Sequence, residues 1–273
     1  MTNDHALPCQ DSLTCSLGWS GSAGAEVTVR FLPPRFASLS ASSTALMWDN
    51  WRVAHACWRA QMPDADPAER LVLAWGGGVS MAEAQLAHQA GFTTAMAAGR
   101  DARLDLIRRH GIIPIDHRRF PDLDHDEHRY RTDPDYKDRY RASEAEFLKV
   151  IDELSNGRGV AILIDHIGGG LHKASLKALA RQGVITTAGW KAGMHLRSVR
   201  ASECIQRHLH VHTHVWRHQD SPAIREYQNH TGWIADDDPN AVWDYDHIPQ
   251  LADAHTHGMV DSYFPLCRIT NPT

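Results

Sequence analysis

The stretch Leu71-Val72-Leu73-Ala74-Trp75-Gly76-Gly77-Gly78 decides how this chain folds, because five apolar residues run directly into three glycines. A short, continuous apolar run predicts a strand that is buried on both faces of a sheet. A helical pattern follows from about Met81 to Ala90. A buried strand, a glycine turn and a helix in this order are typical of the first unit of a parallel α/β sheet.

Strands and helices keep alternating on the C-terminal side of this stretch. Residues 116–141 are polar and too long for a simple connection, so we expect an insertion there. The fold class is therefore α/β, a doubly wound parallel sheet of the Rossmann type. The remaining predicted strands are 27–31, 93–97, 112–115, 160–164 and 184–187, and the remaining predicted helices are 42–61, 101–110, 143–154 and 171–181.

Composition excludes several classes of protein. The 273 residues carry 28 Lys and Arg against 33 Asp and Glu, a formal charge of −5, without a basic run that favours nucleic acid. The longest aliphatic stretch, Val160 to Ile164, is far shorter than the roughly 20 residues of a membrane span. Five scattered cysteines and an N-terminus without a secretion signal predict reduced thiols in a cytoplasmic protein.

The glycine turn lies where a doubly wound fold holds the pyrophosphate of a dinucleotide. The glycines Gly76 to Gly78 match only the first part of the G-x-G-x-x-G pattern, because Met81 stands where the third glycine is expected. The turn is thus either a modified phosphate loop or a plain tight turn. Arg100 follows the second strand, where a cation accepts the 2′-phosphate of NADP, and Arg103 lies one helical turn further on.

Two polar residues follow later strands of the predicted sheet. His166 comes directly after the strand at 160–164, and Lys191 follows the strand at 184–187. Open α/β sheets bind ligands at the carboxyl ends of their strands, so both are candidate active-site residues. His166 is suited to acid–base chemistry, and Lys191 to neutralising a carboxylate or phosphate. The alternatives are a histidine that caps a loop and a solvated surface lysine.

Histidine is in excess, at 19 residues, and four of them alternate between residues 208 and 214. On a strand, this spacing places the four imidazoles on one face. Such a face is able to bind zinc or nickel, but a third ligand at a known spacing is not evident nearby. We therefore interpret the segment as a polar or interface-lining strand and predict that the protein needs no metal.

Eight segments carry the pattern of one known family: Gly21–Val29, Leu71–Gly77, Ala84–Ala87, Thr132–Lys137, Asp165–Gly168, Gly183–Thr187, His212–Val215 and Ala254–His255. Together they resemble the medium-chain dehydrogenase/reductase superfamily, and most closely its crotonyl-CoA carboxylase/reductase branch. The resemblance implies NADP as cofactor, an acyl-thioester substrate and a homodimer. It also implies that Thr187 and Gly189 contact the cofactor and that His214 corresponds to the family's carbon dioxide-contacting histidine.

The departures from the family pattern qualify these implications. About 20 residues precede the Gly-Ser strand, so we expect only a small remnant of the β-rich N-terminal catalytic domain. The Phe-Glu-Thr-Asn run of the family is replaced by Leu17-Gly18-Trp19-Ser20, so carboxylation is not expected. The predicted divisions are the remnant with its connecting helix at 1–62, a nucleotide-binding domain at 63–232, and a C-terminal segment at 233–273 that returns to the remnant.

Three functions remain open at this point. The first is NADPH-dependent enoyl reduction of an acyl thioester or polyketide-like intermediate in secondary metabolism. The second is a cofactor-independent cyclase, isomerase or dehydratase in which His166, Lys191 and His214 perform acid–base chemistry. The third is a non-catalytic partner subunit, because a fold does not determine a function.

Overall fold

The computed structural model describes residues 16–17, 27–28, 41–193, 201–213, 218–233 and 242–268. Contacts divide the chain into two compact units, residues 45–224 on the one hand and residues 1–44 with 225–273 on the other. The strand predicted to carry four alternating histidines at 208–214 begins at His210, because His208 lies in a turn with a φ of 53° and does not share the strand face. The strand is described as far as Thr213, and His214 lies outside the described residues. The larger unit contains the glycine turn.

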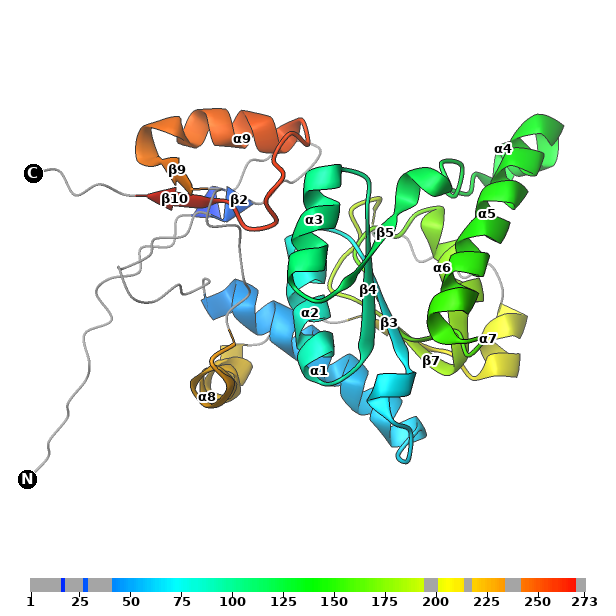
Figure 1. Ribbon diagram of the computed structural model, residues 1–273, viewed down its shortest axis with the longest axis horizontal. Helices are drawn as coiled ribbons and strands as arrows, with labels where there is room; N and C mark the ends of the chain where they lie inside the picture. Colours follow the sequence, from blue (N-terminus) through cyan, green and yellow to red (C-terminus); the bar gives the residue numbers. More distant parts are fainter. Residues whose placement is uncertain are drawn as a thin grey trace, which may run out of the picture. The chain divides into compact units, whose positions relative to one another are not determined.

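A six-stranded parallel sheet forms the centre of the larger unit (Figure 1). The order of its strands matches that of dinucleotide-binding sheets. The strand that comes first along the chain lies in the middle, the next two strands lie on one side of it, and the last three lie on the other side. In space the strands follow one another as β5 (Ile113–Asp116), β4 (Thr93–Ala98), β3 (Leu71–Trp75), β6 (Val160–Asp165), β7 (Leu179–Thr187) and β8 (His210–Thr213). The predicted α/β fold class is confirmed.

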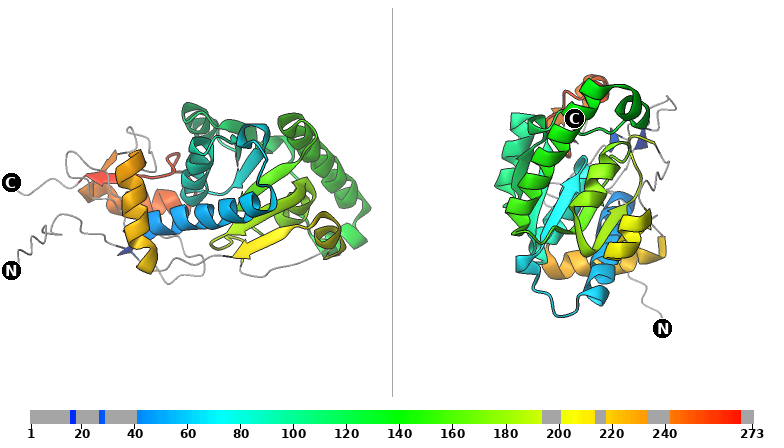
Figure 2. Two further views of the ribbon diagram at one scale, coloured as in Figure 1. Left: turned by 90° about the horizontal axis from the view of Figure 1, so that it is seen from below. Right: turned by 90° about the vertical axis from the view of Figure 1, so that its right-hand side faces the viewer.

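The sheet is covered by helices on both faces. Figure 1 shows α2 (Gly78–Gln89) and α3 (Asp101–Arg109) on one side, and α5 (Pro134–Ser155) and α6 (Leu171–Ala178) on the other. The long helix α1 (Ala41–Gln61) lies on the α2 side of the sheet (Figure 2). Its Asn50 side chain forms hydrogen bonds with residues of both α2 and β7. The remaining helices are α4 (Glu127–Thr132), α7 (Ala201–Arg207), α8 (Ser221–Thr231) and α9 (Ile248–Thr256).

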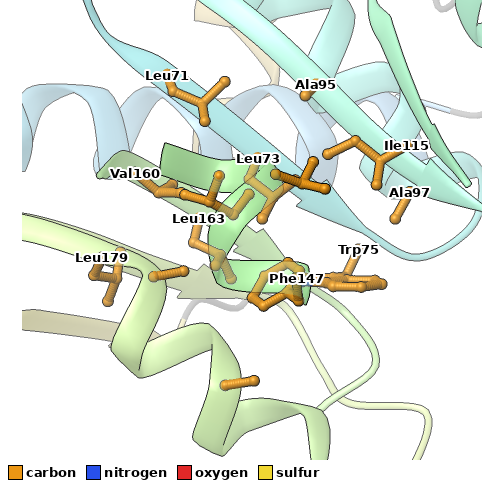
Figure 3. Packing of buried hydrophobic residues seen from close by; sticks show 14 of the residues in the cluster. Leu71, Leu73, Trp75, Ala95, Ala97, Ile115, Phe147, Val160, Leu163 and Leu179 are labelled. Atoms are coloured by element: carbon orange, nitrogen blue, oxygen red, sulfur yellow. The ribbon is translucent and has the colours of Figure 1, made fainter. Parts of the chain in front are cut away.

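The central strands are apolar because both of their faces are buried. All five residues of β3 are at most 4% exposed, which is the continuous pattern that a two-sided strand requires. On one face, Leu73 and Trp75 pack with Leu163 of β6 and with Phe147 of α5 (Figure 3). The Trp75 and Phe147 rings are 5.6 Å apart between centroids. This layer fixes the position at which β3 ends and the glycine turn begins.

Several element boundaries differ from the sequence prediction. The helix predicted at 171–181 ends at Ala178, and residues 179–181 belong to β7 instead. Three other boundaries also differ. Helix α2 begins at Gly78 rather than near Met81, and Gly77 is its N-cap residue. Helix α5 begins at Pro134 rather than Ser143, because proline suits the first helical position and Asp133 caps the helix. Strand β7 begins earlier than predicted because a register shift with β6 accommodates residues 179–183.

The described strands of the smaller unit are two or three residues long. Its strands pair as β1 (Ser16–Leu17) with β2 (Val27–Thr28), antiparallel, and β9 (Val242–Asp244) with β10 (Leu266–Arg268), parallel. Leu251 of α9 packs with Val260 in a small apolar cluster. Within the described part of the chain, no helix has the length and apolar character that crossing a membrane requires.

Candidate functional site

The first two glycines of the turn after β3 differ in their surroundings. Gly76 adopts a φ of 145°, and a Cβ built there would lie 2.1 Å from Oγ of Ser80. The Ser80 hydroxyl donates a 2.8 Å hydrogen bond to the Trp75 carbonyl oxygen, so it is held in that position. A Cβ built at Gly77 would have no atom within 4 Å. Packing therefore requires Gly76, whereas Gly77 faces open space.

The N-terminus of α2 points its backbone amides into this turn. Gly77 is the N-cap residue, and it has no side chain to bond the first amides of the helix. These amides and the positive end of the helix dipole favour an anion. Met81, at the position of the expected third glycine, is buried, and α2 still packs on β3 and β4. The close packing of α2 on the sheet therefore does not require the third glycine.

The loops after β3, β6 and β7 meet at the point where the strand order reverses. The His166 amide donates to the Trp75 carbonyl oxygen at 3.0 Å, and the Lys191 amide donates to the His166 carbonyl oxygen at 3.0 Å. Gly168 makes this close approach possible, because a Cβ there would lie 2.5 Å from the Trp190 ring. The structure thus brings the predicted residues Gly76, His166 and Lys191 to one sheet edge, where doubly wound folds bind ligands.

A buried chain of polar side chains supports His166. Its Nε2 atom lies 3.0 Å from Oε1 of Glu83 on α2, and the other carboxylate oxygen accepts a 2.9 Å hydrogen bond from Nδ2 of Asn50. The Asn50 amide oxygen in turn accepts from the Thr186 hydroxyl at 2.9 Å. The chain connects α1, α2, β6 and β7, so it fixes the relative positions of the elements that form the site.

The imidazole of His166 is enclosed by the protein. Its side chain is 10% exposed, and its Nδ1 atom lies 3.4 Å from the Ala188 amide nitrogen. Burial opposes the charged imidazolium, but the Glu83 carboxylate, together with Asp165 and the backbone at Gly189, outweighs burial and raises the pKa of His166. A carboxylate that orients a histidine and stabilises its charge is an arrangement found in catalytic sites, and it is equally able to hold two loops together.

The other predicted site residues lie at two places: Thr187, Gly189 and Lys191 at or after the end of β7, and Arg100 and Arg103 after β4. Thr187 accepts a 3.0 Å hydrogen bond from the Gly189 amide through its hydroxyl, so these two shape the loop that follows β7. The Lys191 side chain is exposed beside this loop. Arg100 and Arg103 begin the α3 region after β4.

His117 lies close to the backbone before Arg100, and the sequence did not predict this position. It begins a short helical turn after β5, and its Nε2 atom would lie 2.3 Å from a Cβ built at Gly99. The imidazole therefore lies over the end of β4, next to the backbone of Arg100. Pairing of β4 with β5 brings the two strand ends together, and the sequence alone does not show this pairing.

The histidine-rich strand β8 is the edge of the sheet. His210 and His212 alternate with the exposed Val211, and Nε2 of His210 lies 3.3 Å from Oε1 of Gln182. Burial and the neighbouring His210 lower the pKa of His212. Among the residues that the structure describes, no three His, Cys, Asp or Glu side chains are grouped to hold a metal ion.

Glu83 and Asn50 are the residues of the site that sequence reasoning missed. Both side chains belong to residues with 0% exposure, and both lie on helices rather than on loops after strands. The sequence signal for a buried ionic site was the carboxylate of Glu83 inside the mostly apolar segment Met81–Ala87. In the structure every residue of this segment is buried. A buried carboxylate in such a segment requires a partner, and His166 supplies it.

The strand order and the turn after β3 define an α/β domain of the doubly wound type, and comparisons with known proteins show which proteins share this fold. No family model matches the chain. A reducing polyketide synthase, hmp8 of Hypomyces subiculosus, is 26% identical over 164 residues, which are 58% of this chain and 6% of that protein.

Solved structures give the likeness in fold. The crotonyl-CoA carboxylase/reductase AntE V350A in complex with NADP matches with a TM-score of 0.64 and 18% identity, over 89% of this chain and 59% of that one. Alcohol dehydrogenase TADH from Thermus sp. ATN1 matches with a TM-score of 0.60 and 11% identity, over 91% of this chain and 63% of that one. The predicted resemblance is confirmed: the chain has the medium-chain dehydrogenase/reductase fold, and it spans about three fifths of these structures.

Proposed function

We propose that this protein is an NADPH-binding reductase that acts on the enoyl group of an acyl thioester or polyketide-like intermediate in secondary metabolism. One observation carries the proposal: the N-terminus of α2 lacks a side-chain cap and opens at Gly77 onto the sheet edge where the strand order reverses. The similarity in fold to an NADP complex of a crotonyl-CoA carboxylase/reductase and the similarity to a reducing polyketide synthase support it.

The residues at the sheet edge fit NADPH. The pyrophosphate would lie against Gly76 to Gly78, where the helix amides bind an anion and Gly77 leaves room for close approach. Arg100 and Arg103, with His117 beside them, would hold the 2′-phosphate at the end of β4. The loop of Thr187 and Gly189 would face the nicotinamide ring. When bound, the cofactor would supply the hydride for reduction.

The chain's own residues would then hold and orient the reactants. His166, tied to Glu83, keeps the loops after β6 and β7 against the glycine turn. The exposed Lys191 would pair with a phosphate or carboxylate of the acyl-thioester substrate. His214 remains a proposed active-site residue by its place in the family motif.

A second candidate function rests on the His166–Glu83 pair. A buried carboxylate beside an imidazole with a raised pKa is suited to proton transfer without a nicotinamide. In this case His166, Lys191 and His214 would serve a cyclase, isomerase or dehydratase. The enclosure of both ring nitrogens by Glu83 and Ala188 makes the reductase the better supported candidate.

The proposal includes a cytoplasmic homodimer formed through β8. This strand is the edge of the sheet, so one side of its backbone has no neighbouring strand among the described residues. Val211 of β8 is 40% exposed and Ile205 of α7 is 74% exposed, which gives this edge apolar surface. Light scattering tests the dimer, and a mass of 30.5 kDa would contradict it.

The deciding experiment is a titration with NADPH and NADH, followed by tryptophan fluorescence, on the wild type and on Gly77→Asp. Asp is tolerated at helix N-caps and a Cβ at Gly77 would meet no atom within 4 Å, so the variant should fold. Its carboxylate would occupy the space proposed for the pyrophosphate and repel it. We expect the wild type to bind NADPH more tightly than NADH and the variant to bind neither.

Two results would contradict the proposal. The first is a wild type that does not bind at millimolar NADPH, and the second is a variant that binds as well as the wild type. If NADPH does not bind, isomerisation or dehydration of acyl-thioester analogues by the wild type and by His166→Asn tests the second candidate function. Loss of such activity in the variant, with an unchanged circular dichroism spectrum, would support it.

A further inference from the structure

A second group of titratable side chains lies between the insertion and α6, separate from the glycine turn. Lys173 stands in the first turn of α6, and its Nζ atom lies 2.6 Å from Nε2 of His125 in the insertion. The rings of Tyr130 and Tyr140 complete the group: their centroids are 4.6 and 5.5 Å from the Lys173 amine. None of these residues takes part in the function proposed above.

The group is held rigidly from the insertion side. The His125 side chain is 5% exposed, and its ring packs on Tyr130 at 5.1 Å and on Tyr140 at 4.9 Å between centroids. A Cβ built at Gly170 would lie 2.3 Å from the His125 backbone nitrogen, so the two backbones are in close contact. The Tyr136 hydroxyl donates to the Asp124 carbonyl oxygen at 2.6 Å and holds this loop.

The surroundings of Lys173 favour its neutral amine. Burial lowers the pKa of Lys173 and outweighs the nearby carboxylates of Glu127 and Glu144, which favour the ammonium. Lys177, one turn further along α6, also lowers it. The amine stands at the positive end of a helix that has no acidic residue in its first turn. The two tyrosine rings attract a cation and offset part of this effect.

His125 is in the state that a proton acceptor needs. Burial and the amine of Lys173 lower the pKa of His125, so its ring is neutral at physiological pH. A neutral imidazole 2.6 Å from the amine is placed to receive its proton. The Lys173 side chain is partly exposed, so a small reagent has access to the amine.

We propose that Lys173 is a nucleophilic lysine that accepts an acyl group from an acyl thioester, with His125 as the base. The amine nitrogen attacks the thioester carbonyl carbon, and the carbon–sulfur bond breaks. The proton from nitrogen passes to Nε2 of His125 and then to the departing thiolate, so an amide and a free thiol are formed without oxidation or reduction. This modification removes the cation from the ring cluster and does not depend on NADPH binding.

The experiment is peptide mapping by mass spectrometry after incubation of the folded protein with S-acetyl-N-acetylcysteamine near pH 7.5. Lys149 and Lys191 are exposed lysines of the same chain and serve as internal controls. Because the pKa of Lys173 is lowered, a larger fraction of its amine is neutral near pH 7.5 than in an ordinary lysine, so we expect Lys173 to acetylate severalfold faster than either control. In urea the three rates should become equal.

A matched variant tests the base. His125→Gln keeps a polar side chain but cannot take up the proton, so it should slow acetylation of Lys173 severalfold and leave Lys149 and Lys191 unchanged. Near-ultraviolet circular dichroism checks that the variant is folded. Equal rates for the three lysines in the folded wild type would overturn the proposal even if the variant does not fold. An unchanged Lys173 rate in a folded variant would overturn the role of His125.

Discussion

Replacing Glu83 by Gln tests the buried polar chain directly, because the substitution removes the charge and keeps the shape. In the wild type the carboxylate accepts from Asn50 at 2.9 Å and is 3.0 Å from the His166 ring nitrogen, with no exposed surface. A Gln amide presents one oxygen and one NH2 group. It therefore keeps a hydrogen bond to one partner and sets its NH2 group against the N–H of the other.

The expected loss follows from these contacts. A hydrogen bond to a charged group contributes about 1.5–3 kcal/mol, and a donor left without an acceptor in the interior adds to this. We expect the free energy of unfolding to fall by about 2–4 kcal/mol, which for a unit of this size lowers Tm by roughly 5–15 °C. The matched control is Glu69→Gln, because Glu69 is exposed and its ion pair with Arg158 spans 3.4 Å. This control should change stability by less than about 0.5 kcal/mol.

The pH dependence distinguishes loss of the ion pair from loss of packing. The folded-state pKa of His166 is raised, because the effect of burial is outweighed by the Glu83 carboxylate together with Asp165 and the backbone at Gly189. A raised pKa stabilises the folded state fully below the unfolded value of about 6.5, and this contribution disappears as the pH rises through the folded value. The stability difference between the wild type and Glu83→Gln should therefore be larger near pH 6 than near pH 9.

Urea unfolding at the two pH values measures this difference, and the double variant with His166→Asn gives the coupling energy. For a pair in direct contact the coupling should be about 1–3 kcal/mol. A difference that is equal at both pH values, or additive effects of the two substitutions, would refute the interpretation that Glu83 and His166 form a charged pair. The stability loss would then arise from the Asn50 contact alone.

Three further substitutions test the turn, the insertion and the proposed cofactor site. Gly76→Ala should destabilise by about 2 kcal/mol or more in urea unfolding, because its φ of 145° and the 2.1 Å approach to Ser80 both oppose a Cβ. Adding Ser80→Ala should recover only part of this loss, and a full recovery would show that backbone strain is unimportant. Asp133→Ala should cost about 1 kcal/mol, because Oδ1 accepts the Tyr136 amide at the start of α5, and an unchanged urea midpoint would contradict that cap. Arg100→Ser should reduce the preference for NADPH over NADH by about tenfold or more in a fluorescence titration, whereas loss of affinity for both cofactors alike would place the 2′-phosphate elsewhere.

The parts of the fold that the sequence predicted are those with a strong local pattern. Strand β3 was predicted with the bounds that the structure has, because a two-sided strand needs an unbroken apolar run. The start of α5 was missed because the segment after Pro134 is polar and only Tyr136 and Tyr140 of its first two turns are buried. Here the Asp-Pro pair was the better signal, since it marks an N-cap and a first helical position.

The sequence predicted only those residues of the site that follow a strand. Gly76, His166 and Lys191 follow strands, so parallel topology alone places them at one edge. The partners Glu83 and Asn50 lie on helices, and their meeting depends on how α1 and α2 cross the sheet, which no local pattern encodes. The same is true of His125 and Lys173, which are 48 residues apart and meet at 2.6 Å.

The surroundings of His166 and His125 shift the pKa values of these two histidines in opposite directions. At His166 a carboxylate at 3.0 Å favours the imidazolium, whereas at His125 an amine at 2.6 Å opposes it. One histidine is therefore held as a proton-bearing link between loops, and the other as a neutral acceptor beside a nucleophile. The abundance of histidine in this chain thus has no single explanation, because burial lowers the pKa of both imidazoles and the charged groups packed against each one decide the direction of the net shift.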